Sequence, residues 1–325
     1  MIGKIIKASA LAAAVTVTMV GSALALDLKW AHVYAEATPF HKWSVWAADE
    51  IGKKTDGRVN VTVYSNSSLG NESDINEGLS IGSVDIIWTG PNFAERDYGP
   101  IAISDYPFML KNIDHWKAYR DSDLFQELSA GYKEATGNEV VAITWYGYRH
   151  VTSNFPILAP EDMKGLKIRV PNSPMMQMFP NAVGANPTPI AFAEVYLALQ
   201  QGVVDAQENP LPTIKDMKFY EVQSNISLTG HVGNSLIIVV AGPSMDAMGA
   251  DADAVRAILK EAAAGAAEDI IKSEAELAAW FEEQGITVNV VDKGPFQKAI
   301  EPVVTDPTKV PYTLDHYNRL QALAQ

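Results

Sequence analysis

The fold prediction rests on KGLKIRVPNSPMMQMFPNAVGANPTPIAFAEVYLALQQGVVDAQENPLP, residues 164–212, in which short apolar segments end in polar residues. Residues 166–170 alternate in the manner of a β-strand, and Pro171 ends that strand because proline has no N–H to donate. Residues 202–210 are typical of a buried strand, which Pro210 stops in the same way. The stretch therefore predicts two strands that both end in polar side chains.

A helix is expected between these two strands. Residues 186–189, NPTP, predict an extended connection, and residues 190–199 carry apolar side chains at three- and four-residue spacing. Strand, helix and strand in this order indicate an α/β sheet. Ligands of open α/β sheets lie outside the carboxyl ends of the strands, so Arg169 at one strand end and Glu208 and Asn209 at the other are expected to share a cleft.

Arg169 is the first candidate for ligand binding. An arginine at a strand end is held by a rigid element, and its planar fork of donors suits the capture of a carboxylate by two hydrogen bonds. The alternative is a surface arginine paired with an acidic side chain. The residue alone leaves both readings open.

A wider set of residues resembles a known family. The stretch quoted above is followed by KFYEVQ at 218–223 and preceded by LGNES at 69–73, GSVDI at 82–86 and RHVTSN at 149–154. Together they closely resemble the substrate-binding proteins of tripartite ATP-independent periplasmic (TRAP) transporters of the DctP type. The resemblance implies an α/β, two-lobed periplasmic binding protein with a long helix that braces both lobes.

The resemblance also implies a function and a set of site residues. It implies a monomeric, non-enzymatic protein without a cofactor, which captures a small carboxylate and delivers it to the small and large membrane subunits of a TRAP permease. Arg169 would clamp the carboxylate. The other residues that it places at the ligand are a second arginine, an amide donor, an acid of the first lobe and three further cleft residues: Arg149, Asn209, Glu72, Glu208, Asn172 and Phe192.

Some positions depart from the sialic acid-binding relatives. Where those proteins place polar or charged groups, this chain has Val33, Gly90 and Phe93, so sialic acid is not expected. Trp88 and Asn92 are expected to line the pocket, with core packing as the alternative for each of them and for Phe192. The carboxylates and amides named above suit several hydroxyls, which favours a sugar acid such as a hexuronate or an aldonate. The alternatives are a C4-dicarboxylate or other organic acid, with Arg149 holding the second carboxylate, and a sensory binding protein without a permease.

The amino terminus predicts export. Lys4 and Lys7 precede an apolar run, and residues 23–25, ALA, form a cleavage site, so residues 1–25 are expected to be a signal peptide. Removing its two lysines changes the net charge from −14 to −16, with 23 Lys and Arg against 39 Asp and Glu. This charge argues against nucleic acid as a partner. The chain contains no cysteine, so neither a lipid anchor on cysteine nor a disulfide is expected.

Two chain crossings define the expected lobes. An extended segment near Tyr148 and an apolar strand from Asn234 could both cross between lobes, which predicts a hinge. We expect a first lobe of residues 26–147 and 235–272, and a second of residues 148–234 and 273–325. Residues 251–284 predict a helix of roughly 50 Å that exceeds the length of one lobe.

Two enzyme-like patterns receive little support. Residues 78–82, GLSIG, match the G-x-S-x-G motif of serine hydrolases around Ser80, but here a helix is expected before the serine and a strand after it, the reverse of a nucleophile elbow. The six histidines show no metal-ligand spacing, so no metal site is expected.

Overall fold

The structure, a computed structural model, describes residues 25–324. The predicted signal peptide lies outside the described residues, apart from Ala25. Within residues 25–324, no helix combines the length and the apolar character needed to cross a membrane.

The amino-terminal half alternates strands and helices. Thr38 caps the first helix by accepting a hydrogen bond from the N–H of His41, and Asn71 and Asp74 form a reciprocal capping box at the second. A break at residues 121–122 separates α4 from α5. The elements are β1 (Leu26–Ala31), α1 (Pro39–Lys54), β2 (Val59–Tyr64), α2 (Glu72–Ile81), β3 (Ile86–Thr89), α3 (Pro91–Ala94), α4 (Ile113–Arg120) and α5 (Asp123–Thr136).

The rest of the chain supplies both long strands and the long helix. Its elements are β4 (Glu139–Ser153), β5 (Lys167–Val170), α6 (Met178–Ala182), β6 (Asn186–Pro189), α7 (Val195–Gln200), β7 (Ala206–Pro210), α8 (Leu211–Asp216), β8 (Asn225–Val240), α9 (Gly242–Ala247), α10 (Ala252–Glu283), β9 (Thr287–Asn289), α11 (Gly294–Val304) and α12 (Leu314–Ala322). The predicted helix at 190–199 is divided into a 3-10 turn at Phe192–Glu194 and α7.

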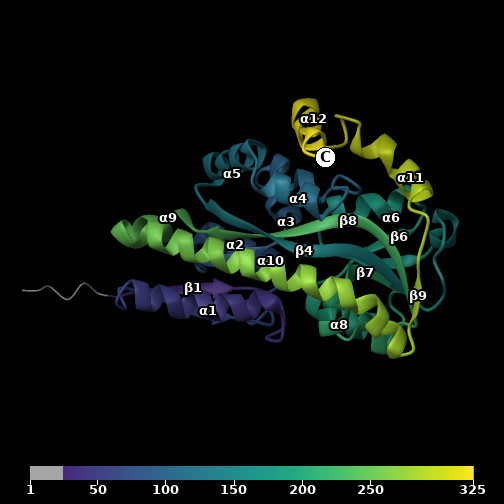
Figure 1. Cartoon of the computed structure of the whole chain (residues 1–325), viewed down its shortest axis with the longest axis horizontal. Helices are drawn as coiled ribbons and strands as arrows, with labels where there is room; N and C mark the ends of the chain where they lie inside the picture. Colours follow the sequence, from purple (N-terminus) through teal and green to yellow (C-terminus); the bar gives the residue numbers. More distant parts are fainter. Residues whose placement is uncertain (1–24, 325) are drawn as a thin grey trace, which may run out of the picture.

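One nine-stranded sheet runs through the molecule in the order β2-β1-β3-β8-β4-β7-β5-β6, with β9 beside β8. The antiparallel strands β4 and β8 pair along almost their whole length. The end of β8 at 237–240 pairs with β3, whereas the end of β4 at 149–153 pairs with β7. The two central strands therefore connect the first-lobe strands to the second-lobe strands, as Figure 1 shows.

The NPTP segment forms the edge strand of the sheet in the second lobe. Residues 186–189 form β6, which pairs in parallel with β5 and has no further neighbour. Prolines are tolerated at a sheet edge, because the missing N–H would have faced away from the ladder. The expected extended connection is therefore an edge strand that positions β5 and, with it, Arg169.

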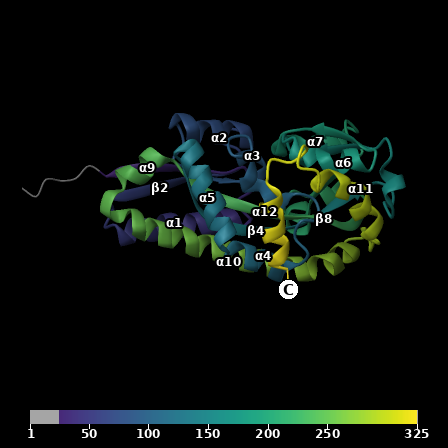
Figure 2. The same ribbon diagram turned by 90° about the horizontal axis from the view of Figure 1, so that it is seen from above.

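The long helix α10 braces both lobes, as predicted. It has 32 residues, which corresponds to about 48 Å. It packs against α1 and β4 and, near its carboxyl end, against α8 and β9. Near the middle of α10, Asp269 accepts a hydrogen bond from the indole N–H of Trp43 on α1 at 2.9 Å. Figure 2 shows α10 running along one side of both halves of the molecule.

The carboxyl-terminal helix departs from the expected lobe boundaries. Residues 273–325 were expected in the second lobe, but α12 packs against α5 and against the 3-10 segment Gly99–Asp105. Its contacts include a 2.8 Å hydrogen bond between Nε2 of His115 and the carbonyl oxygen of Leu320. The chain therefore returns to first-lobe elements after α11, a further crossing that carries no local sequence signal.

Candidate functional site

Three adjacent strands place the predicted polar residues at the junction of the lobes. Arg149 lies on β4, Asn209 on β7 and Arg169 on β5, and β7 pairs with both of the other strands. All three side chains are buried, with exposed fractions of 1–3%. The strand ends that the sequence analysis expected to share a cleft are therefore neighbours in one sheet.

An inner cavity lies where these strands meet the first lobe. Its volume is about 20 Å³, which is room for about one water molecule. The first lobe contributes residues from the β1–α1 connection, α2 and α3, and the second lobe contributes β5 and β7. The lining residues are Tyr34, Glu72, Gly90, Asn92, Phe93, Tyr146, Arg149, Arg169, Pro171, Phe192, Asn209, Asn234 and Leu236.

Arg169 has an unused donor at this cavity. Its Nε and Nη2 donate to the carbonyl oxygen of Ile190 at 2.9 and 2.7 Å, whereas its buried Nη1 has no hydrogen-bond partner. Among the described residues, no carboxylate lies within ion-pair distance of its guanidinium. Burial lowers the pKa of Arg169 to about 10, although Glu72 and Glu208 oppose this shift. The surface ion pair considered as an alternative is therefore not what the structure contains.

Arg149 is held differently, because its charge is already matched. Its Nε and Nη2 donate to the carboxylate of Glu208, with 2.8 Å from Nη2 to Oε1, and its Nη1 donates to Asn234 at 2.8 Å. Nη2 also contacts Oδ1 of Asn209 at 3.2 Å. Burial would raise the pKa of Glu208, but Arg149 and His231 hold it below its usual value. The pair therefore forms a rigid, nearly neutral floor beneath the cavity.

Glu208 does not line the inner cavity, in contrast to its expected place in the cleft. It lies behind Arg149, is 1% exposed and also contacts Nε2 of His231 at 3.2 Å. The physical reason is the adjacent guanidinium, since a buried carboxylate is stable only when paired and hydrogen-bonded. In the structure Glu208 therefore lies behind Arg149, and its contact with ligand hydroxyls stays a prediction.

Glu72 faces the second-lobe residues from the first lobe. It is the first residue of α2, and its half-buried carboxyl group lines the inner cavity that Arg169 also lines. Burial raises its pKa, and Arg169 and Arg149 oppose that rise. The two lobes thus present an acid and an unmatched cation to the same cavity, without an ion pair between them.

Aromatic side chains form the rest of the inner wall. The rings of Tyr34 and Tyr146 lie 5.6 Å apart, and Phe192 lies 6.0 Å from Tyr34 and below the guanidinium of Arg169 at the same distance. Phe192 is buried and lines the cavity, so it combines packing with a place at the site. Sequence reasoning missed Tyr146 and Asn234, because each stands inside an apolar strand without a local motif.

The remaining predicted residues lie in three different environments. Trp88 is fully buried and donates to Ser44 at 2.8 Å, so it belongs to the core, which is the alternative stated for it. Asn92 lines the inner cavity, and its buried Nδ2 has no partner. Asn172 is exposed and lies outside the inner cavity.

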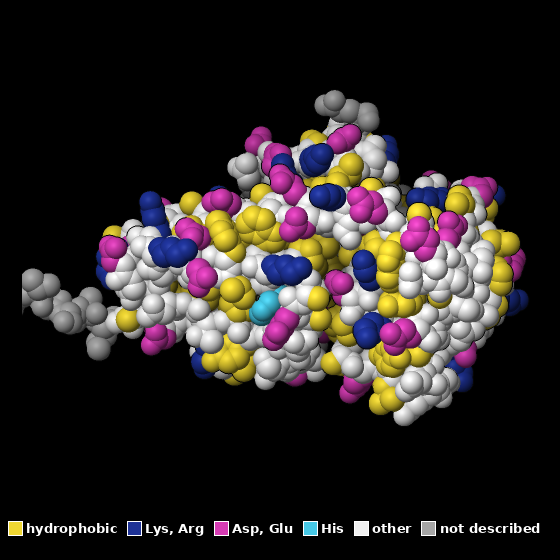
Figure 3. Space-filling model, turned by 60° about the horizontal axis from the view of Figure 1, so that its bottom comes forward, with side chains coloured by type: hydrophobic (Ala, Val, Ile, Leu, Met, Phe, Trp, Pro, Cys, Tyr) yellow, Lys and Arg dark blue, Asp and Glu magenta, His cyan; other side chains and the backbone are white. Residues whose placement is uncertain are grey.

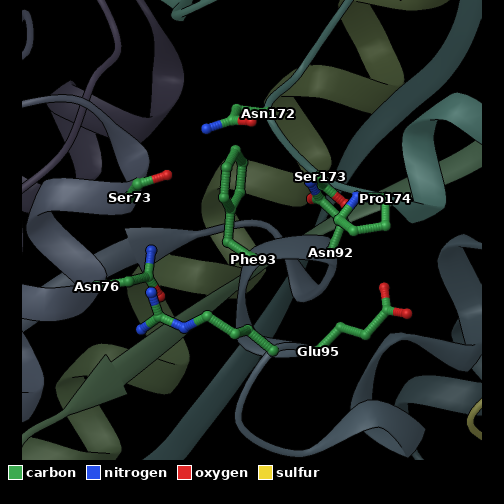
Figure 4. A pocket seen from close by; sticks show the side chains of 9 residues that line it. Ser73, Asn76, Asn92, Phe93, Glu95, Asn172, Ser173 and Pro174 are labelled. Carbon is green, nitrogen blue, oxygen red and sulfur yellow. The ribbon is translucent and has the colours of Figure 1, made fainter. Parts of the chain in front are cut away.

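Two further cavities adjoin the inner one across Phe93. The larger, which we call the outer chamber, has a volume of about 310 Å³ and is lined by Ser73, Asn76, Asn92, Phe93, Glu95, Arg96, Asn172, Ser173 and Pro174. The smaller has about 140 Å³ and shares Glu72, Ser73, Phe93, Arg169 and Asn172 with its neighbours. Figure 4 shows Phe93 projecting toward Asn172, with Ser73 on one side of its ring and Ser173 and Pro174 on the other.

The serine of the G-x-S-x-G match lies on the surface of a helix. Ser80 is an exposed residue within α2, and its hydroxyl donates to the carbonyl oxygen of Asn76 at 3.2 Å, as in many helices. Between residues 25 and 324, no three His, Asp or Glu side chains are grouped so as to hold a metal ion.

On the face shown in Figure 3, acidic and basic side chains are interspersed.

The comparisons with known proteins identify the family. The profile of "Bacterial extracellular solute-binding protein, family 7" (DctP) matches residues 30–309. The chain belongs to this family. The sialic acid-binding periplasmic protein of Vibrio cholerae is 33% identical over 265 residues, which cover 79% of this chain and 80% of that protein.

Two more relatives show how varied the ligands of similar proteins are. A TRAP periplasmic solute-binding protein from Roseobacter denitrificans, solved with bound L-galactonate, has a TM-score of 0.84 and 31% identity, and the match covers 92% of this chain and 99% of that one. The C4-dicarboxylate-binding periplasmic protein of Rhodobacter capsulatus is 31% identical over 86% of this chain and 83% of that protein. TRAP binding proteins bind small carboxylates and work with membrane permease components, so the predicted family, fold and class of function are confirmed.

Proposed function

We propose that this protein holds one carboxylate of a sugar acid, such as a hexuronate or an aldonate, against Arg169 and delivers the ligand to a TRAP permease. The observation that carries this proposal is the buried Nη1 of Arg169, a cationic donor that no described residue satisfies. A buried charge without a partner is costly, and a ligand carboxylate would relieve that cost. The other two donors are held by Ile190, so the fork keeps one orientation before the ligand arrives.

The state of Arg149 favours a single carboxylate. Its guanidinium is neutralised by Glu208, so a second carboxylate would have to displace an existing ion pair. Glu72 adds an acid on the opposite side of the same cavity. A C4-dicarboxylate is the alternative ligand, because the similar protein from Rhodobacter capsulatus is a C4-dicarboxylate-binding protein. The titration described below distinguishes sugar acids from dicarboxylates.

The proposal also assigns a place and a mode of action. The chain is exported to the periplasm, acts as a monomer and releases its ligand chemically unchanged. The first lobe is formed around residues 26–147 and 235–272, and the second around residues 148–234 and 273–325, apart from α12, which packs on the first lobe. Support comes from the periplasmic relatives and from the strand pairing, in which β3 contacts one half of β8 and β7 contacts one half of β4.

Calorimetric titration tests the role of Arg169. The probes are L-galactonate, D-glucuronate, D-galacturonate and succinate, and at least one sugar acid is expected to bind more tightly than succinate. Arg169→Ala should weaken that binding by roughly 30- to several-thousand-fold, because truncating one partner of a buried charge pair costs about 2–5 kcal/mol. Arg169→Lys should also bind poorly, since an ammonium does not reproduce the planar fork.

The matched control is Arg58→Lys, which alters an exposed arginine bonded to Asp251 and should leave binding unchanged. Arg169→Ala within a few-fold of the wild type would contradict the proposal, and succinate as the tightest probe would favour the dicarboxylate alternative. Mass spectrometry of the probe after long incubation should return it unchanged. Turnover that Ser80→Ala abolishes would show that the protein is an enzyme.

A further inference from the structure

The outer chamber concentrates polar atoms that lack partners. Within residues 25–324, nine buried side-chain nitrogen or oxygen atoms have no hydrogen bond, and three of them belong to chamber residues: Nδ2 of Asn92, Oε2 of Glu95 and Oγ of Ser173. Asn92 and Ser173 are only 6% and 2% exposed. An unsatisfied buried polar group typically costs about 1–3 kcal/mol, so three around one chamber point to a missing binding partner.

The chemistry of these atoms suits hydroxyl groups. Asn92 offers a donor, Glu95 an acceptor, and Ser173 both, and a hydroxyl likewise donates and accepts. The other oxygen of Glu95 already accepts from the hydroxyl of Tyr106 at 2.7 Å, which fixes the carboxylate in place. The one cation of the chamber, Arg96, is exposed and lies 3.3 Å from its neighbour Asp97. The chamber therefore combines hydroxyl-binding groups with a fixed acid.

We propose that the outer chamber is a second subsite, which takes the neutral, hydroxylated end of the ligand whose carboxylate lies on Arg169. This inference rests on the proposed function and specifies the ligand class further, as a monocarboxylate with a polyhydroxylated chain. The inner cavity, at about 20 Å³, has no room for such a chain, whereas the chamber offers about 310 Å³. Asn92 and Phe93 line both spaces, so one ligand can extend past them from the first space into the second.

Glu95 makes the subsite select a hydroxyl over a carboxylate at the far end of the ligand. A carboxylate at the far end of the ligand would meet the fixed acid, and two like charges side by side in a cavity repel strongly. A hydroxyl at the same place would donate to that acid and form a charge-assisted bond. The chamber thus favours an aldonate over the dicarboxylate of the same length.

A pair of probes that differ only at the far end tests this rule. L-Galactonate ends in a hydroxymethyl group, and galactarate carries a second carboxylate there. By calorimetry at pH 7.5, the wild type should bind L-galactonate at least about 10-fold more tightly than galactarate. Glu95→Gln keeps the volume of the side chain and should weaken L-galactonate by about 10-fold, because a neutral acceptor replaces a charged one. The same variant should tighten the binding of galactarate.

Ser173→Ala should weaken L-galactonate by about 2- to 10-fold. The matched control is Glu77→Gln, which alters an exposed glutamate of α2 outside the chamber and should change neither affinity. Opposite responses of the two probes to Glu95→Gln distinguish a direct contact from a general loss of structure, which would weaken both. Unchanged affinities in Glu95→Gln and Ser173→Ala, with binding still dependent on Arg169, would overturn the subsite and leave the proposed function standing. A wild type that binds neither L-galactonate nor any other sugar acid of the panel would overturn both.

Discussion

The carboxylate of Glu274 on α10 accepts a hydrogen bond from the backbone N–H of Tyr148 on β4, with 2.7 Å between nitrogen and Oε1. Its other oxygen accepts from the indole N–H of Trp145 at 2.7 Å. Gly147, which precedes Tyr148, has a φ of +123° and lies at a register shift in the β4–β8 ladder. The bracing helix is therefore bonded to the central strand where that strand passes from one lobe to the other.

The Glu274 carboxyl should make stability depend on pH. Burial raises its pKa to about 7, against hydrogen bonds from Trp145 and Tyr148 that lower it. The folded state thus binds the proton more tightly than the unfolded state, whose pKa is near 4.5. The stabilisation is complete below pH 4.5 and is lost as pH rises through about 7, a change on the order of 3 kcal/mol.

Glu274→Gln removes this titration, so the free energy of unfolding of the variant should rise relative to the wild type between pH 5 and pH 8. Urea denaturation at both pH values measures the difference. Glu276→Gln, an exposed change on the same helix, serves as the control and should follow the wild type. Identical pH profiles for Glu274→Gln and the wild type would refute the assignment.

Gly147 should tolerate no side chain. A Cβ there would lie 2.6 Å from Cβ of Pro210 and 2.7 Å from Oε1 of Glu274, and its positive φ disfavours other residues. Gly147→Ala should therefore lower the free energy of unfolding by about 1–3 kcal/mol. Gly52→Ala is the control, because the new methyl group meets nothing within 4 Å on helix α1 and should stabilise by up to about 1 kcal/mol. Equal stabilities of the two variants would show that the crossing is not tightly packed.

Features that depend on neighbouring residues could be predicted from the sequence. The length of α10 and the extended, proline-rich segment at 186–189 each follow from a few neighbouring residues. The place of Arg169 followed from its position at the end of a short strand, a position that Pro171 marks. These features required no knowledge of the tertiary structure.

Features that depend on distant residues could not be predicted in the same way. Glu208, near the end of β7, was expected to face the ligand. In the folded chain its carboxylate is paired with Arg149, which lies 59 positions earlier in the sequence. Trp88 is held in the core by Ser44, and α12 returns to α5. The alternation of apolar and polar residues shows which face of a strand a side chain lies on, but it does not show which distant residue that side chain contacts.

Removing one member of the Arg149–Glu208 pair should destabilise the protein, whereas replacing both members should change its free energy of unfolding much less. Arg149→Met leaves a buried carboxylate without its cation and should lower the free energy of unfolding by about 3–5 kcal/mol. Adding Glu208→Gln should recover a large part of that loss, because no unpaired charge remains. Denaturation of both single variants and the double variant measures the coupling. Additive losses would contradict the view that the two residues act as one unit.

The final prediction concerns closure of the lobes. Glu72 begins α2 in the first lobe and Arg169 ends β5 in the second, yet both line one cavity of about 20 Å³. A ligand that touches both must enter when the lobes are further apart, and closure then removes water and strengthens the contact with Arg169. Only contacts made in the closed state can drive closure, so Glu72 should set the degree of closure while Arg169 sets the initial capture.

Small-angle scattering with the tightest sugar acid of the panel tests this division of roles. The radius of gyration of the wild type should fall on binding, and Glu72→Ala should bind more weakly and contract less at saturation. Glu77→Ala, an exposed change on the same helix, should contract as the wild type does. A wild-type radius that stays constant at saturating ligand would mean that the ligand enters a closed protein. In that case the acid at position 72 would act in binding alone, and the pairing of β4 with β8 would hold the lobes together as one rigid body.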